Sequence, residues 1–228
     1  MLIGGLQKTS LIDYPDKICS TIFTMGCNFK CPYCHNPELV NRTATPIPEE
    51  EVFEFLRKRE KVLEGVCITG GEPTMQQDLP KFAKKIKSIG LLVKLDTNGS
   101  NQKMLSKMIN EKLVDYIAMD IKGPLDKYSK IVGVDVDKHA IEKSVKLIRN
   151  SKIDYEFRTT VVPDLVSKDD IVKIGKWLKG SKRYHLQKFR PAKVLDKTFE
   201  EKTCTSQELE SYMLIVRKYF ESCGIRND

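Results

Sequence analysis

Long hydrophobic runs are missing from this 228-residue chain. No apolar stretch approaches the roughly 20 residues that a membrane-spanning helix needs, so we expect no membrane association. The first residues, Met1–Lys8, lack the basic start and long apolar core of a signal peptide. Low-complexity segments, internal repeats and interdomain linkers are missing too. We therefore expect a cytoplasmic protein with a single domain over residues 1–228, in which 1–16 form an N-terminal hairpin extension.

Arginine-rich runs and basic patches interleaved with aromatic residues are also absent, so nucleic acid is not an expected partner. The net charge is nevertheless +8, and the positive excess lies around Lys168–Lys197. Such a surface could bind an acidic protein or an anionic small molecule, or it could simply be solvated lysine. A hydrophobic content of 40% with 31% charged residues indicates a globular chain and not a disordered one.

Strand-like and helix-like segments alternate after an N-terminal hairpin predicted over 2–6 and 10–14. The strand-like runs are short, apolar and rich in β-branched residues, as in strands buried on both faces. They cover 18–25, 66–69, 91–96, 116–120, 155–162 and 184–189. Helical patterns begin at Pro48 and recur near 79–89, 101–112, 138–150, 168–179 and 206–222. Six such units predict an α/β fold, a partial (β/α)6 TIM-like barrel with an N-terminal β-hairpin.

Three of the seven cysteines lie within eight residues, directly after the first full strand. Cys27, Cys31 and Cys34 have the spacing C-x3-C-x2-C, which favours metal binding over disulfides in a chain expected in the cytoplasm. Three thiolates can hold three corners of a cubane iron–sulfur cluster and leave one iron open. A structural zinc would need a fourth ligand, which His35 could supply only with strain. A zinc or electron-transfer module stays as the non-enzymatic alternative.

Polar residues follow the next strands, where sites on parallel-sheet folds collect. Gly70 and Gly71 would let backbone approach a ligand, and Glu72 could accept from a cationic amine. Asp120 and Lys122 point to the same side of their strand, either as a salt bridge or as contacts to a zwitterionic ligand. Further along, the residues Glu156, Arg158 and Thr160 alternate onto one face, which we expect to be the barrel interior.

The cysteine segment resembles the signature of the radical S-adenosylmethionine (radical SAM) superfamily, with Tyr33 at its aromatic position. The resemblance implies a 4Fe–4S cluster on the three cysteines, whose open iron binds S-adenosylmethionine with Tyr33 near the adenine. Gly70, Gly71 and Glu72 match the family's Gly-Gly-Glu motif, which holds the methionine ammonium.

Three later segments resemble those of the glycyl-radical-enzyme activases, the group that contains pyruvate formate-lyase activating enzyme. They are an Asp-Thr-Asn-Gly turn at 96–99, an Asp-x-Lys pair at 120–122 and an Arg-x3-Val-Pro segment ending at 162–163. The opening residues 5–15, with 34–39, are similar to the branch named anaerobic ribonucleoside-triphosphate reductase activating proteins. By this resemblance the further cofactor contacts are Asp96, Asn98, Asp120, Lys122 and Arg158.

One position departs from that group. Pyruvate formate-lyase activating enzyme has a histidine on its sixth strand that reaches the ribose, and the matching place here holds Phe189. We therefore expect Gln187 as the ribose contact, with His185 as a second candidate. A ferredoxin-like insert, which some activases carry, is missing because no further cysteine-rich motif follows Cys34.

The function implied by the resemblance is an oxidoreductase that cleaves S-adenosylmethionine reductively and generates a glycyl radical on a partner enzyme. The partner would be of the anaerobic ribonucleotide reductase or pyruvate formate-lyase type, and a flavodoxin or ferredoxin would donate the electron. Such donors are typically acidic, which the basic surface late in the chain would suit. The alternative is a radical SAM enzyme acting on a small molecule or peptide, similar to 7-carboxy-7-deazaguanine synthase.

Overall fold

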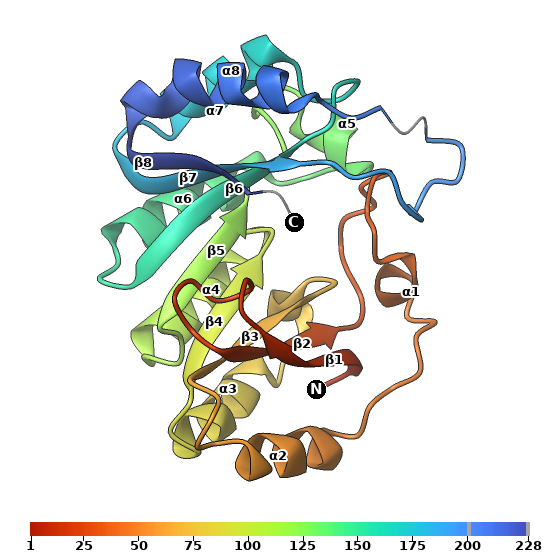
Figure 1. Ribbon diagram of the computed structural model, residues 1–228, viewed down its shortest axis with the longest axis vertical. Helices are drawn as coiled ribbons and strands as arrows, with labels where there is room; N and C mark the ends of the chain where they lie inside the picture. The colour runs from red at the N-terminus through yellow and green to blue at the C-terminus, as the bar shows by residue number, and fades with distance from the viewer. Residues whose placement is uncertain (200–201, 227–228) are drawn as a thin grey trace.

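One curved β-sheet carries the fold, and Figure 1 shows helices along its outer side. The computed structural model describes residues 1–199 and 202–226. The sheet has eight strands in the order β1 to β8; β1 is antiparallel to β2 and every later pair is parallel. The strands are β1 (Ile3–Ser10), β2 (Cys19–Thr24), β3 (Gly65–Gly70), β4 (Leu92–Thr97), β5 (Tyr116–Asp120), β6 (Asp154–Val161), β7 (Ser181–Lys188) and β8 (Phe220–Arg226).

Helices connect the successive parallel strands, because a parallel pair can be joined only by a crossover. Figure 1 shows α2 and α3 outside one end of the sheet and α7 and α8 outside the other. The helices are α1 (Pro37–Val40), α2 (Glu49–Lys58), α3 (Leu79–Ser88), α4 (Gln102–Asn110), α5 (Tyr128–Val132), α6 (Lys138–Asn150), α7 (Lys168–Trp177) and α8 (Ser206–Val216), with 3₁₀ turns η1 (Pro73–Met75) and η2 (Arg217–Tyr219).

The predicted partial barrel is confirmed, and its six expected strands correspond to β2 through β7. Within the described ranges, no helix is both long and apolar enough to cross a bilayer. The main apolar core lies between the sheet and its helices, while several charged side chains are buried on the inner face. The carboxyl ends of the parallel strands therefore meet around one polar interior.

The N-terminal hairpin differs from its expected form. β1 pairs with β2, so the second arm is the first barrel strand and not residues 10–14. The hydroxyl of Ser10 accepts from the backbone N–H groups of Ile12 and Asp13 at 3.3 and 3.2 Å. These local bonds fold the segment into a turn, as serine side chains commonly do.

The C-terminal helix is shorter than predicted, and the last strand was not expected. The sequence predicts a helix over 206–222, but α8 ends at Val216 and Phe220 begins β8 beside β7. The ring of Phe220 stacks on Tyr184 of β7 with centroids 4.6 Å apart. Pairing and packing on the sheet edge thus override the helical spacing of the apolar residues.

Candidate functional site

A cavity of about 240 Å³ opens at the carboxyl ends of the parallel strands, where the site was predicted. It is lined from the cysteine loop and from the ends of β3, β4, β5, β6 and β7. Of the residues predicted from sequence, it brings together Cys27, Cys31, Tyr33, Cys34, Gly70, Gly71, Glu72, Asp96, Asn98, Asp120, Lys122 and Gln187. Arg158 is not among the lining residues and lies beneath them.

The cysteine loop leaves β2 and is held by backbone bonds to distant segments. Gly26 N–H donates to the Leu39 carbonyl at 2.7 Å, and Lys30 N–H donates to the Val132 carbonyl at 2.9 Å. Gly71 is required because a Cβ there would lie 2.1 Å from the Gly26 carbonyl oxygen. The Gly-Gly segment therefore lets the end of β3 touch the start of the cysteine loop.

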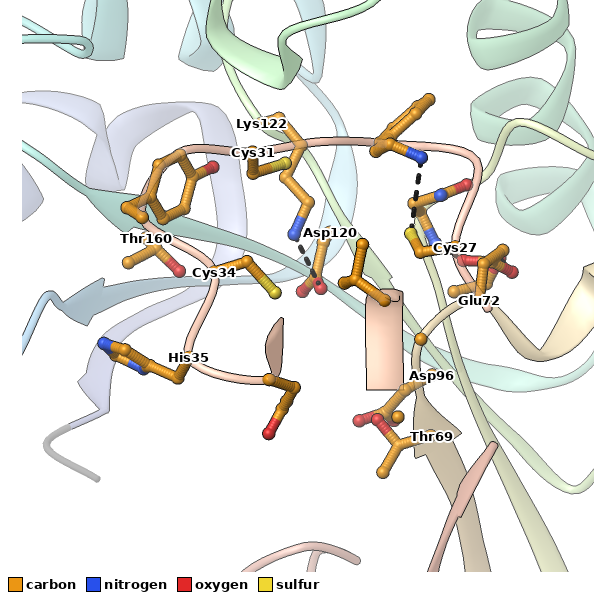
Figure 2. Close-up of a pocket in the computed structure, with 18 of the residues that line it drawn as sticks. Cys27, Cys31, Cys34, His35, Thr69, Glu72, Asp96, Asp120, Lys122 and Thr160 are labelled. Carbon is orange, nitrogen blue, oxygen red and sulfur yellow. Dashed lines mark hydrogen bonds and ion pairs between the residues drawn. The ribbon is translucent and has the colours of Figure 1, made fainter. Parts of the chain in front are cut away.

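The three thiols face one space, as Figure 2 shows for Cys27, Cys31 and Cys34. Among the described residues, no three His, Cys, Asp or Glu side chains are close enough to hold a single metal ion. A cubane binds thiolates at separate iron corners, and three thiolates could hold three of its corners. Burial raises the pKa of Cys27 to about 12, so a bound metal would be needed to keep that thiol deprotonated.

His35 is turned away from the thiols, and Figure 2 shows its ring on the far side of Cys34. Its Nε2 lies 2.9 Å from the Arg190 carbonyl, and its ring stacks on Phe189 with centroids 5.3 Å apart. Both contacts hold the imidazole against the loop after β7. The arrangement gives no support to His35 as a fourth ligand of a zinc site.

Tyr33 is a buried residue whose hydroxyl finds no hydrogen-bond partner among the described residues. Its ring packs edge-on against Phe189, with centroids 6.3 Å apart. A buried hydroxyl without a partner is rare, and it requires a polar atom from a ligand or from water. Tyr33 therefore brings a buried ring and hydroxyl to the aromatic side of the cavity.

Glu72 is almost completely buried and is surrounded by donors. Its carboxylate accepts from Asn98 N–H and the Thr97 hydroxyl, both at 2.7 Å, and from the hydroxyl and N–H of Thr74. Burial raises the pKa of Glu72, while these donors act in the opposite direction. The carboxylate is thus fixed at the cavity wall between β3 and β4.

An asparagine pair joins the cysteine loop to the turn after β4, a link that the sequence did not reveal. The Asn98 amide donates to Asn28 Oδ1 at 3.0 Å, and the Asn28 amide donates to the Ser100 hydroxyl at 2.9 Å. The Ser100 hydroxyl in turn donates to Asn98 Oδ1 at 2.6 Å. These bonds orient the loop relative to Glu72, to which the Asn98 backbone is bound.

Replacing Asn28 with alanine is expected to lower the free energy of unfolding by about 1–2 kcal/mol, because two hydrogen bonds are lost near a buried amide. The cysteine loop should also become less constrained, so bound iron should pass to a chelator several-fold faster. Urea unfolding and the rate of iron release measure the two effects. Asn110→Ala is the matched control, since it removes only an exposed bond to Ser106 at 3.3 Å; equal effects in both variants would contradict the role.

Alternating charges lie along the cavity floor. Arg158 donates from Nε to Asp120 at 2.9 Å and from Nη2 to Asp96 at 3.1 Å. Lys122 Nζ donates to the other oxygen of Asp120 at 3.1 Å, the dashed contact in Figure 2. Although burial raises the pKa of Asp120, the charges of Arg158 and Lys122 lower it to about 2. Arg158 thus holds both aspartates ionised from below.

The positions of Gln187 and His185 on β7, and of Phe189 just after it, narrow the choice of a residue that could contact the ribose. Gln187 lines the cavity, whereas Phe189 is buried and packs against His35 and Tyr33. His185 lies in a second cavity of about 540 Å³, with Nδ1 at 3.5 Å from Glu156. Because side chains alternate along a strand, Gln187 and His185 share a face but differ in depth.

Comparisons with known proteins agree with this geometry. A family model described as the radical SAM superfamily matches residues 21–178. A Methanocaldococcus jannaschii protein, named provisionally as a glycyl-radical enzyme activating enzyme, is 36% identical over 99% of this chain and 95% of its own length. A pyruvate formate-lyase-activating enzyme from Clostridium pasteurianum is 28% identical over 78% of this chain and 76% of its own. A Thermococcus kodakarensis protein, named provisionally as a GTP 3′,8-cyclase, is 28% identical over 57% of this chain and 44% of its own.

Solved structures share the fold at low sequence identity. Streptococcus suis SuiB bound to S-adenosylmethionine matches 90% of this chain with a TM-score of 0.65 and 17% identity. The chain spans about half the length of SuiB, since the match covers 48% of that protein. The structure of anSMEcpe with bound AdoMet and a peptide matches 90% of this chain and 62% of its own, with a TM-score of 0.65 and 15% identity.

Proposed function

Because the chain belongs to the radical SAM superfamily, we propose that its cavity holds a 4Fe–4S cluster on Cys27, Cys31 and Cys34, with S-adenosylmethionine beside it. The chain is a radical SAM enzyme, and residues 1–228 would act as its one domain. The observation that carries the proposal is the meeting of three thiols and a set of polar strand-end side chains in one cavity. When bound, the cluster and the cofactor supply one-electron cleavage of the sulfonium to a 5′-deoxyadenosyl radical.

The protein's own residues would bind and orient the cofactor. The ammonium of its methionine part would be held by Glu72 and the carbonyl groups of Gly70 and Gly71, where a negative carboxylate is already fixed. Tyr33, with its unpaired buried hydroxyl, would contact the adenine side of the cavity. Gln187 would reach the ribose from β7. These contacts would limit the access of water to the reacting atoms.

The floor residues would set the charge around the same cofactor. Asp96, Asn98, Asp120 and Lys122 line the cavity, and they would provide contacts to the amino-acid and nucleoside parts. Arg158 lies below them and pairs with both aspartates, so its part would be to position those carboxylates. This role for Arg158 replaces a direct contact with the cofactor carboxylate.

The substrate would be a glycyl-radical enzyme, of the anaerobic ribonucleotide reductase or pyruvate formate-lyase type. Support comes from the match to the M. jannaschii protein, which runs over 99% of this chain, and from the C. pasteurianum enzyme. A flavodoxin or ferredoxin would supply the electron. The alternative substrate, a small molecule or peptide, has weaker support because two cyclase relatives are each 28% identical to this chain, against 36% for the M. jannaschii protein.

The test is anaerobic incubation of the iron-reconstituted protein with dithionite, S-adenosylmethionine and a candidate glycyl-radical enzyme. We expect 5′-deoxyadenosine to form and a glycyl radical to be detected in the partner by electron paramagnetic resonance. A partner variant with alanine at the radical glycine is the control and should give no signal. Cleavage without a radical in any candidate partner would favour the small-molecule alternative, and no cleavage at all would contradict the proposed cavity.

A further inference from the structure

Lys94 is a fully buried lysine on β4 that the proposed function does not use. Its exposed fraction is 0%, and its side chain lies on the same interior face as Asp96, two residues further along the strand. The ammonium forms an ion pair with Asp96 and lies 3.6 Å from the sulfur of Cys67. Lysine is almost never completely buried unless it is paired, so the contact with Asp96 explains how its charge is tolerated.

The carboxylate of Asp96 accepts hydrogen bonds from two cations that lie outside the cavity lining. Lys94 donates to its Oδ1, and Nη2 of Arg158 on β6 donates to its Oδ2 at 3.1 Å. Asp96 lines the cavity, whereas neither cation is among the lining residues. A carboxylate oxygen can accept more than one hydrogen bond, so both oxygens keep capacity for donors inside the cavity.

If the side chain at position 94 served only to pack the core, an apolar residue would stabilise the fold more than lysine does. The neighbouring interior cluster consists of Tyr14, Cys19, Cys67, Tyr116 and Ala118, with Leu92 packed against it. Burying a charge beside such residues costs desolvation that even a good ion pair often fails to recover. The presence of lysine therefore indicates a role exerted on Asp96.

We propose that Lys94 is a positioning residue of the cofactor site, which fixes the orientation and charge of Asp96 for binding S-adenosylmethionine. The inference rests on the proposed function, in which Asp96 contacts that cofactor. Lys94 acts through Asp96 and touches neither the cofactor nor the cluster. Removing its charge leaves Asp96 with Arg158 alone and frees one carboxylate oxygen to rotate.

The charged groups around Asp96 give the inference a pH signature. Burial and Asp120 on β5 raise the pKa of Asp96, whereas Arg158 on β6 and Lys94 on its own strand lower it below the usual value. Two further titratable groups face these cations: Cys67 on β3 faces Lys94, and Glu156 on β6 faces Arg158. Without Lys94 the pKa of Asp96 must rise, so the carboxylate would gain a proton as the pH falls.

The experiment compares iron-reconstituted wild-type protein with Lys94→Met and Lys94→Arg under anaerobic conditions. Equilibrium dialysis at pH 6, 7 and 8 measures the affinity for S-adenosylmethionine, and iron content is measured on each sample. We expect Lys94→Met to weaken binding about ten- to a hundredfold, the loss typical of removing a group that orients a ligating side chain. The loss should be no smaller at pH 6 than at pH 8, iron content should not change, and Lys94→Arg should recover most of the affinity.

Lys87→Met is the matched control, because Lys87 pairs with Asp115 at 2.7 Å outside this cavity. Wild-type affinity of Lys94→Met at every pH would overturn the inference, as would an equal loss in the control. If Lys94→Met fails to fold, Lys94→Gln gives the same readout with a polar side chain. Failure of the wild type to bind S-adenosylmethionine would instead overturn the proposed function on which the inference rests.

Discussion

Replacing Cys31 with alanine is expected to abolish cluster binding, lowering bound iron after reconstitution from about four atoms per chain to below about one. Cys31 is buried in the cysteine loop and lines the cavity with the other two thiols. A cubane that already leaves one iron without a protein ligand cannot lose a second protein ligand and stay bound with the same strength. Reductive cleavage of S-adenosylmethionine should therefore fall to the background rate.

Iron analysis, the visible absorbance of the cluster and 5′-deoxyadenosine formation measure this loss. Cys223→Ala is the matched control, because Cys223 lies on β8 and is not among the residues that line the cavity. Burial raises the pKa of Cys223 to about 11, so it would stay a neutral thiol. Wild-type iron content in Cys31→Ala, or an equal loss in Cys223→Ala, would contradict the assignment of the cluster.

The cavity was predictable because consecutive parallel strands bring their carboxyl ends to one edge of the sheet. Cys27, Glu72, Asp96 and Asp120 are far apart in the chain, yet each follows or ends a strand and each lines the same space. The spacing of the cysteines and the type of residue at each strand end therefore contained enough information. The sequence did not show how deep in the barrel each side chain of a strand lies. For this reason His185 was a candidate for the ribose contact beside Gln187.

The elements that sequence did not reveal depend on contacts between distant segments. Residues 217–222 continue the helical spacing of α8, but the free edge of β7 offers unpaired backbone groups that 220–226 complete. Lys94 precedes Asp96 in an apolar run, and only the sheet shows that its ammonium turns inward. The gain in free energy for β8 comes from a partner elsewhere in the chain, whereas the ammonium of Lys94 pairs with Asp96 on its own strand.

The partner of Arg158 could not be predicted from the sequence and is given by the structure. A charged residue inside an apolar strand predicts either an ion pair or an anionic ligand, because a buried guanidinium needs a counter-charge. The sequence could not choose between these possibilities. The structure gives Arg158 two aspartates, at 2.9 and 3.1 Å, which makes it the common partner of Asp120 and Asp96.

Replacing Arg158 with methionine is expected to lower the free energy of unfolding by about 3 kcal/mol, the lower end of the cost of breaking a buried pair. The lower end applies because Asp96 keeps Lys94 and Asp120 keeps Lys122. In a chain of this size the melting temperature should fall by about 6–12 °C. Urea unfolding of the metal-free protein measures the loss without any contribution from a cofactor. Lys173→Met, which breaks the exposed pair with Asp126, is the control and should change stability by less than about 1 kcal/mol.

The decrease in the free energy of unfolding caused by Arg158→Met should also depend on pH in a defined direction. In the folded wild type the pKa of Asp120 is lowered from 3.8 to about 2, so its ionised form stabilises the fold above the unfolded value. That contribution disappears as the pH falls toward the folded value, and the variant lacks most of it at any pH. The difference between wild type and variant should therefore be full at pH 7 and clearly smaller at about pH 2.5, close to the folded value. A difference that stays constant between these two pH values would show that Arg158 stabilises the barrel by packing and not by its charge.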